Sequence, residues 1–291
     1  MDIKEILGKF EIFQKIHLPE IEAFKSEEDG SDYDVWKIVS ENNKYVLKKA
    51  KEYEIEVYST FFNESVKGAP KFYKSINIDG YDYFLMEYAE GNSLSRCDRK
   101  DLICAIDALI SIQERYWEDR ALSKSGFSFE ASLTKRKNRG KYLNDAELEK
   151  AYATYLEIYS SVPRTLCHDD LLPFNVLVSD EGATIIDWEY AGILPYPSSL
   201  VRLIAHGTTN EKDLFYMKDE DKNFAIEYYY DKFIKRKGIL YEDYRKAIDY
   251  FLLYEYCEWI MLGIKYGNTD SDRYRQYYKK AKEHLRKILK Y

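Results

Sequence analysis

Three oxygen-bearing side chains in the middle of the chain lie beside a predicted hairpin. Asp170 and Asn175 are five residues apart, and Asp187 follows after strand-like residues 176–178 and 184–186, which flank a turn at residues 180–182. A hairpin brings its two arms back to the same place. We therefore expect Asn175 and Asp187 to share a Mg²⁺ ion, because carboxylate and amide oxygens suit that cation.

This arrangement meets the needs of phosphoryl transfer. The reaction requires a carboxylate that orients the attacking hydroxyl and accepts its proton, oxygen ligands for Mg²⁺, and a cation on the nucleotide phosphates. Taken singly, Asp169 and Asp170 could instead cap a turn, and Asp187 could begin one. The order His-x-Asp-x-x-x-x-Asn, then hairpin, then Ile-Ile-Asp favours phosphoryl transfer over turn capping.

Residues 166–192 resemble the catalytic core of the aminoglycoside phosphotransferase/choline kinase family, relatives of the protein kinases. Members carry His-Gly-Asp-x-x-x-x-Asn followed by Ile-Asp-Trp or Ile-Asp-Phe, and this chain has the corresponding pattern from His168 to Trp188. The resemblance implies that Asp170 is the catalytic base and that Asn175 and Asp187 hold Mg²⁺. It also implies a structural role for His168 within the catalytic loop.

The chain departs from the family pattern at two positions. Asp169 stands where the family usually has glycine, and Ser199 stands where it usually has an aspartate that supports the catalytic loop from behind. The spacing to Asn175 still selects Asp170 rather than Asp169 as the base. How the loop is supported is left open by the sequence.

The lysine that contacts ATP in the family is expected on the strand around residues 45–48. Lys48 is our choice, because Lys49 points to the opposite face of a strand. The following helix should supply a carboxylate partner. Glu54 shares an inward face with Tyr58 and Phe61 at helical spacing, and Glu52 and Glu56 are more outward competitors.

Two further nucleotide contacts follow from the resemblance. Ser31, in the loop of residues 28–34, would lie over the phosphates. Residues 85–91 resemble the hinge strand, where adenine would bind the Glu87 carbonyl and the Ala89 N–H.

The pattern of elements predicts an α+β, two-lobed protein-kinase-like fold. Residues 1–89 read as a nucleotide-binding lobe, mainly antiparallel sheet with one helix, and residues 90–291 as a helical lobe with the catalytic hairpin and the acceptor site. Predicted helices cover residues 52–62, 101–116, 145–159, 222–235, 241–264 and 270–291. The basic run at residues 135–139 is interpreted as a solvated loop.

The acceptor should lie in front of Asp170, against the C-terminal helices. Glu255, Glu258 and Trp259 share a helical face that would suit an amine, since carboxylates pair with ammonium groups and tryptophan attracts cations. An ordinary exposed helix face is the competing interpretation. Either an aminoglycoside-type acceptor or choline or ethanolamine agrees with this face.

Composition narrows the setting. The 291 residues carry a net charge of -7 and contain 16% aromatic residues, so a nucleic-acid partner and disorder are both disfavoured. We expect no signal peptide and no membrane span. The four cysteines lack CxxC spacing and suggest reduced thiols in a cytoplasmic protein. We also expect no obligate protein partner.

The sequence thus predicts an ATP-dependent (or GTP-dependent) and Mg²⁺-dependent phosphotransferase of the aminoglycoside-phosphotransferase type, which acts on a hydroxyl of a small, cationic molecule. A choline or ethanolamine kinase is the alternative acceptor class. A catalytically inactive kinase fold used for binding is the alternative of another kind. A protein kinase is disfavoured, because His-Arg-Asp, Asp-Phe-Gly and an activation segment ending in Ala-Pro-Glu are missing.

Overall fold

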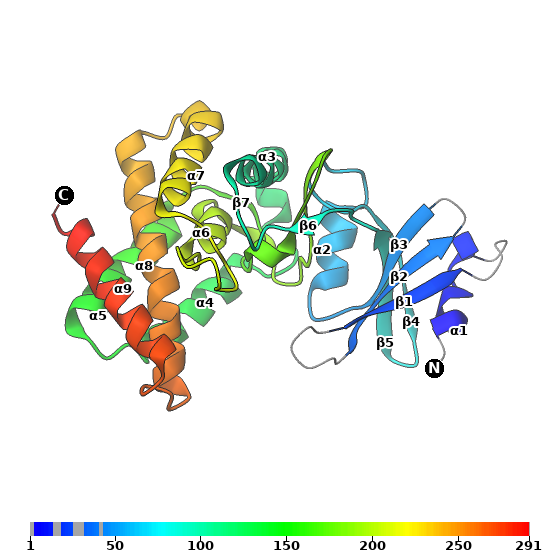
Figure 1. Ribbon diagram of the computed structural model, residues 1–291, viewed down its shortest axis with the longest axis horizontal. Coiled ribbons are helices and arrows are strands. Elements are labelled where there is room, and N and C mark those ends of the chain that lie inside the picture. The colour runs from blue at the N-terminus through cyan, green and yellow to red at the C-terminus, as the bar shows by residue number, and fades with distance from the viewer. Residues whose placement is uncertain (1–2, 14–18, 26–31, 41–42, 291) are drawn as a thin grey trace.

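The chain forms two lobes in a computed structural model that describes residues 3–13, 19–25, 32–40 and 43–290 (Figure 1). The predicted α+β class and two-lobed arrangement are confirmed. The N-terminal lobe is a five-stranded antiparallel sheet of order β1-β2-β3-β5-β4. Its elements are α1 (Ile3–Leu7), η1 (Glu11–Phe13), β1 (Glu20–Lys25), β2 (Asp32–Ser40), β3 (Asn43–Lys49), α2 (Glu54–Phe61), β4 (Phe72–Ile78) and β5 (Tyr81–Glu87).

Strand β3 sends alternate side chains to the two faces of this sheet. Tyr45 and Leu47 join a small apolar cluster with α1 and η1, which the sequence did not lead us to expect. Val46 lies on the other face, in the main core with α2. Lys48 therefore points toward α2 and the second lobe, and Lys49 points away from it.

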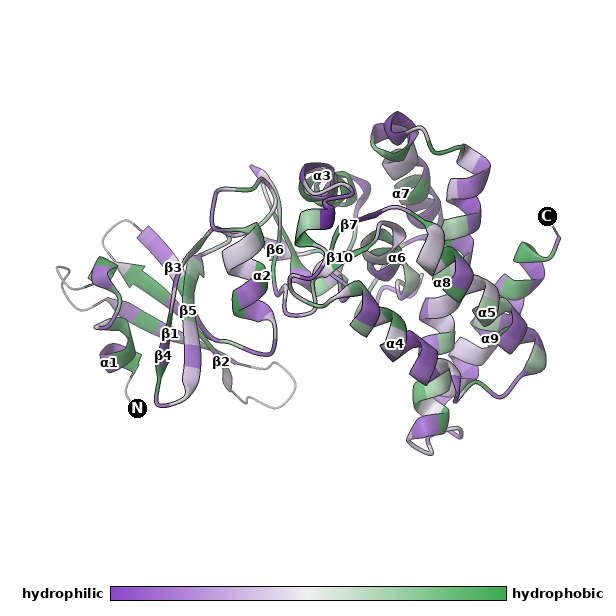
Figure 2. Ribbon diagram, turned by 180° about the vertical axis from the view of Figure 1, so that it is seen from behind, coloured by the Kyte–Doolittle hydropathy of each residue, from purple (hydrophilic) through white to green (hydrophobic). Residues whose placement is uncertain are grey.

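The C-terminal lobe is mainly helical, with its helices on the side away from the sheet (Figures 1 and 2). Three short antiparallel pairings, β6–β8, β8–β9 and β7–β10, lie next to the lobe junction. Its strands are β6 (Asn92–Ser93), β7 (Arg164–Cys167), β8 (Val176–Ser179), β9 (Gly182–Ile185) and β10 (Gly192–Pro195). Its helices are α3 (Arg99–Arg115), η2 (Arg120–Leu122), α4 (Phe129–Gly140), α5 (Ala146–Ser161), η3 (Pro173–Asn175), α6 (Pro197–Ala205), α7 (Asp219–Lys232), η4 (Ile234–Lys237), α8 (Tyr241–Lys265) and α9 (Asp272–Ile288).

The interpretation of residues 135–139 as a solvated loop was wrong, because they lie within α4. Ser128 caps this helix by accepting a hydrogen bond from the Ala131 N–H. The run is not evenly exposed either, since the Arg136 side chain is buried. A helix places neighbouring residues on different faces, so a basic run can hold one inward residue among outward ones.

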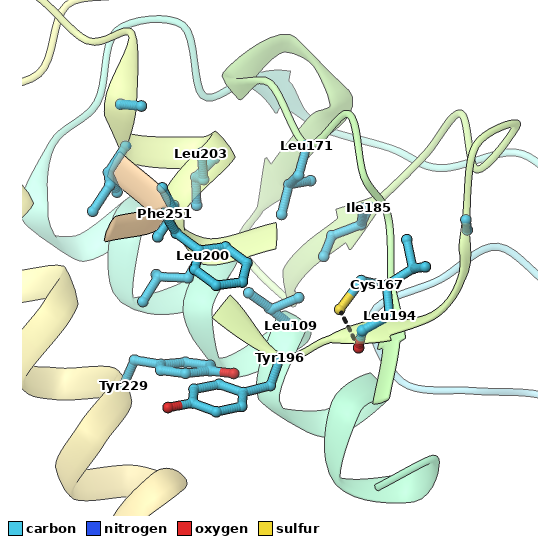
Figure 3. Close-up of a cluster of buried hydrophobic side chains, with 14 of the residues drawn as sticks. Leu109, Cys167, Leu171, Ile185, Leu194, Tyr196, Leu200, Leu203, Tyr229 and Phe251 are labelled. Carbon is cyan, nitrogen blue, oxygen red and sulfur yellow. Dashed lines mark hydrogen bonds between the residues drawn. The ribbon is translucent and has the colours of Figure 1, made fainter. Parts of the chain in front are cut away.

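A dense apolar core supports the loop of residues 168–175 (Figure 3). Leu171 within the loop and Cys167 just before it are fully buried, beside Leu194 and Leu200. Cys97, Cys104, Cys167 and Cys257 are all free thiols. In the part of the chain that the structure describes, we find no helix long and apolar enough to cross a bilayer.

Candidate active site

One cation lies between two carboxylates at the junction of the lobes. The Lys48 Nζ is 2.6 Å from Glu54 Oε1 and 2.5 Å from Asp187 Oδ1. Lys48 comes from β3, Glu54 from the first turn of α2, and Asp187 follows β9, so three distant segments meet here. We call these three residues the interlobe cluster. Glu52 is exposed, and Glu56 also lies outside this cluster.

Charge within the interlobe cluster is set by burial and pairing. Burial lowers the pKa of the Lys48 ammonium, but the charges of Glu54 and Asp187 more than offset this and raise it above its ordinary value. Burial also opposes ionisation of Asp187, yet Lys48 holds its pKa below the usual range. The site therefore presents an ammonium group beside an ionised carboxylate whose side chain is 36% exposed.

The loop of residues 168–175 is held by hydrogen bonds to both neighbouring segments. The His168 Nε2 donates to the Ile186 carbonyl at 2.8 Å, and the His168 backbone N–H donates to the Ser199 hydroxyl at 3.0 Å. Burial lowers the pKa of His168 and thereby favours the neutral form of its ring. Ser199, which stands where the family has an aspartate, therefore still supports the loop.

Asp169 is also accommodated by a buried partner. The Arg136 Nη2 on α4 is 2.6 Å from Asp169 Oδ1, and both side chains are about 5% exposed or less. Asp169 has a φ of 58°, in the left-handed region that favours glycine. The ion pair offsets this backbone cost, and it explains how a charged residue can occupy the usual glycine position.

Asp170 belongs to a second group of charges. The Arg202 guanidinium on α6 donates to Asp170 Oδ1 from Nε at 3.1 Å and from Nη2 at 2.8 Å. Its Nη1 donates to Glu255 Oε2 at 2.7 Å and to Glu258 Oε2 at 3.1 Å, both on α8. We call Asp170, Arg202, Glu255 and Glu258 the C-lobe cluster.

Within the C-lobe cluster, Arg202, Glu255 and Glu258 have side chains at most 14% exposed. Burial alone would raise the pKa of Glu255, but Arg202 and then His206 hold it at about 2. Glu258 also forms an ion pair with Arg139 and accepts a hydrogen bond from the Tyr254 hydroxyl at 3.1 Å. Each glutamate that the sequence suggested for an amine already has arginine partners within the protein.

A cavity of about 230 Å³ opens in front of Asp170. It is lined by Lys135, Arg139, Asp169, Asp170, Tyr190, Arg202, Tyr254, Glu255, Glu258, Trp259 and Leu262. The structure thus brings Glu255, Glu258 and Trp259 to the cavity that holds Asp170. Trp259 and Leu262 also line an adjoining cavity of about 400 Å³ at the turn between α8 and α9.

Asn175 and Asp187 have oxygens suited to a cation. The Asn175 Nδ2 donates to the Asp170 carbonyl at 3.1 Å, which leaves its Oδ1 available, and Lys48 uses only Oδ1 of Asp187. The Ile186 N–H donates to the Asn175 carbonyl at 2.9 Å and joins the two segments. Described residues contain no group of three or more His, Cys, Asp or Glu that could hold a metal, so a Mg²⁺ ion here would need nucleotide oxygens as further ligands.

The other residues that the sequence predicted to contact the nucleotide lie outside the interlobe cluster or outside the described residues. Ser31 is outside the described residues. Glu87 ends β5, and both Glu87 and Ala89 line a third cavity, of about 560 Å³, together with residues 67–70, α3 and the β8–β9 turn. Neither Lys48 nor Asp187 lines this cavity.

Reasoning from the sequence missed Arg136 and Arg202, the two arginines that hold Asp169 and Asp170. A signal for Arg202 exists, because it is the single charge in the otherwise apolar or small-residue helix α6. A charge in such a helix needs a buried partner. No comparable signal marks Arg136, which sits among four other basic or polar residues.

The chain is similar in sequence to known phosphotransferases. A model of the phosphotransferase enzyme family matches residues 27–222. Protein LicA of Haemophilus influenzae is 38% identical over 55 residues, a stretch that covers 18% of this chain and 21% of LicA. The match to LicA therefore spans about a fifth of either protein.

Solved structures share the fold over nearly the whole chain. A choline kinase from Cryptosporidium parvum aligns with a TM-score of 0.65 and 17% identity, covering 99% of this chain and 98% of its own. An aminoglycoside phosphotransferase from Alicyclobacillus acidocaldarius gives 0.64 and 13%, covering 98% and 94%. The phosphotransferase APH(4)-Ia, in a ternary complex with AMP-PNP and hygromycin B, gives 0.59 and 14%, covering 98% of each chain.

Proposed function

The chain belongs to the phosphotransferase enzyme family, and we propose that it transfers the γ-phosphate of ATP to a hydroxyl group of a small molecule. The observation that carries the proposal is the interlobe cluster, where Lys48 lies between Glu54 and Asp187 next to the loop that bears Asp170. We assign residues 1–89 to nucleotide binding and residues 90–291 to catalysis and acceptor binding. ATP as donor is supported by the AMP-PNP complex of a fold relative.

In the proposed reaction the acceptor oxygen forms a bond to the γ-phosphorus while the bond from that phosphorus to the β,γ-bridging oxygen breaks. ADP leaves with the electron pair, and the hydroxyl proton passes to Asp170. Lys48 binds the phosphates, Glu54 orients Lys48, and His168 holds the loop. Asn175 and Asp187 would hold Mg²⁺, which would neutralise the charge that develops on the phosphate oxygens.

Ser31, Glu87 and Ala89 are proposed from the family resemblance to contact the nucleotide. Glu255, Glu258 and Trp259 are proposed to line the acceptor site, because their helical face borders the cavity in front of Asp170. An acceptor of the aminoglycoside type, or choline or ethanolamine, follows from the same resemblance. The charges around the acceptor cavity favour a different class of acceptor.

Binding of MgATP to the purified protein tests this function first. We expect saturable binding by calorimetry that is lost in Lys48→Met, because the phosphates lose their cation. Lys49→Met is the matched control, since Lys49 is the next residue of β3 and points away from the site. Equal affinities in all three proteins, or no binding to the wild type, would refute the proposal.

A further inference from the structure

The cavity in front of Asp170 offers more unpaired donors than unpaired carboxylates. Asp169 is paired with Arg136, and Asp170, Glu255 and Glu258 are paired with Arg202. A cationic acceptor would therefore meet carboxylates that already have cationic partners within the protein.

Lys135 contributes a charge to this cavity that no carboxylate neutralises directly. Its ammonium lies 5.2 Å from the ring centre of Phe127 and 5.1 Å from that of Tyr190. Among the described residues it forms no ion pair, although it feels the more distant charges of Asp169 and Asp170, and burial lowers its pKa. It is therefore a donor group with unused hydrogen-bonding capacity at the wall of the cavity.

Arg139, one helical turn along α4, is also incompletely used. Its Nη1 contacts Glu258 and, at 3.5 Å, the Tyr254 hydroxyl. Within the described part of the chain, its Nε and Nη2 make no hydrogen bond, and its side chain is 25% exposed. An arginine with two free donor positions in one plane is suited to a two-oxygen anion.

We propose that the acceptor is a small hydroxy acid, with or without an amino group, and that Lys135 and Arg139 bind its anionic group while Asp170 receives its hydroxyl. This inference rests on the proposed phosphotransferase function and names the acceptor class for the same site. It differs from the cationic acceptor that the sequence predicts. The reason is that Glu255 and Glu258 already have arginine partners, while among the described residues Lys135 has no carboxylate partner and Arg139 uses only its Nη1.

The test uses acceptors in pairs that differ by one carboxylate. Serine is compared with ethanolamine, homoserine with 3-aminopropan-1-ol, and glycerate with glycerol, with choline and kanamycin as cations that lack an acid. Transfer from MgATP is followed by product formation. We expect kcat/KM for the best acid to exceed that of its acid-free twin by roughly tenfold or more, the worth of one charge-assisted hydrogen bond.

Variants on α4 then locate the anionic group. Lys135→Gln and Arg139→Gln should each lower kcat/KM for that acid by roughly tenfold through a higher KM, and should lower it less for the acid-free twin. Lys137→Gln is the matched control, because Lys137 is an exposed lysine on the same helix. Its kinetic constants should equal those of the wild type.

The other possible results contradict either this inference alone or the proposed function as well. If the protein binds MgATP but no acid is preferred over its twin, or if choline or kanamycin is the better acceptor, this inference is wrong and the proposed function stands. If Lys135→Gln weakens MgATP binding without changing the preference for acids, the lysine serves the nucleotide phosphates and the inference is also wrong. If the wild type does not bind MgATP, the proposed function fails and this inference fails with it.

Discussion

The interlobe cluster and the C-lobe cluster solve different problems with similar residues. In the interlobe cluster a single lysine faces two carboxylates, and the residues come from both lobes. In the C-lobe cluster Arg202 bridges three carboxylates, with Arg139 adding a second cation, and all of these residues come from the second lobe. In the first group Lys48 contacts only Oδ1 of Asp187, and in the second each of the three carboxylates has at least one arginine partner.

This difference separates two kinds of buried charge. A charged group that keeps an oxygen or an N–H without a partner can bind a ligand. Charged groups that are fully paired mainly hold the loop and the helices in place. By this criterion the carboxylates of α8 fix Arg202 and through it Asp170. Lys135 and Arg139 on α4 keep donors without partners among the described residues, and these are the groups that we propose for the acceptor.

The largest expected effect comes from Asp170→Ala. If Asp170 receives the hydroxyl proton, loss of its carboxylate should lower kcat by about 10²–10⁴-fold, with the affinity for MgATP nearly unchanged. Steady-state kinetics and calorimetry would measure the two quantities. Asp231→Ala, exposed on α7, should behave as the wild type, and an Asp170→Ala enzyme with normal kcat would remove this residue from catalysis.

Arg136→Met should cause the largest loss of stability, about 3–5 kcal/mol, because it leaves Asp169 buried without its partner. Asp169→Gly should also destabilise the protein, because it leaves Arg136 buried without its partner, although glycine suits the positive φ at this position. The double variant should recover much of the loss in a chemical denaturation cycle. Simply additive losses would mean that the two side chains are not coupled.

Asp187→Ala tests the other cluster. Removing this carboxylate takes away a partner of Lys48 and a proposed metal ligand, so the affinity for MgATP should fall by roughly 10–100-fold, the worth of one charged hydrogen bond. Calorimetric titration at fixed Mg²⁺ measures the change. An unchanged affinity would show that the interlobe cluster does not bind the metal–nucleotide complex.

The C-lobe cluster also predicts a pH dependence of stability. The pKa of Glu255 is about 2 in the folded protein and about 4.3 in an unfolded chain. Its contribution is therefore fully present above the unfolded value and is lost as the pH falls from there toward 2. The unfolding free energy should fall less steeply on acidification in Glu255→Gln than in the wild type, and Glu242→Gln, exposed on the same helix, should keep the wild-type slope.

Ser199→Ala should have the smallest effect. The buried His168 N–H would lose its acceptor, which costs about 1 kcal/mol and loosens the loop. The adjacent Ser198 is buried, and its hydroxyl has no hydrogen-bond partner among the residues that the structure describes, so Ser198→Ala should cost nothing measurable. Equal stability of the two variants would show that Ser199 does not support the loop.

The sequence predicted most residues of the interlobe cluster but not the charge pairs of the C-lobe cluster. Strand alternation selected Lys48 over Lys49, and helical spacing selected Glu54, because both periods are local properties of the backbone. The helices around residues 129–140 and 197–205 were not predicted. They hold Arg136 and Arg202, whose partners lie 33 and 32 residues away in the sequence.

Local patterns in the sequence alone determined the fold class, the position of the hairpin and the order of the motif from His168 to Asp187. Only the tertiary structure decided how the charges pair. Arg136 compensates for Asp169, Ser199 holds His168, and Arg202 takes up the carboxylates of α8. The physical reason is that the strength of a charge pair depends on distance and burial, and both are settled only when α4, α6 and α8 pack together.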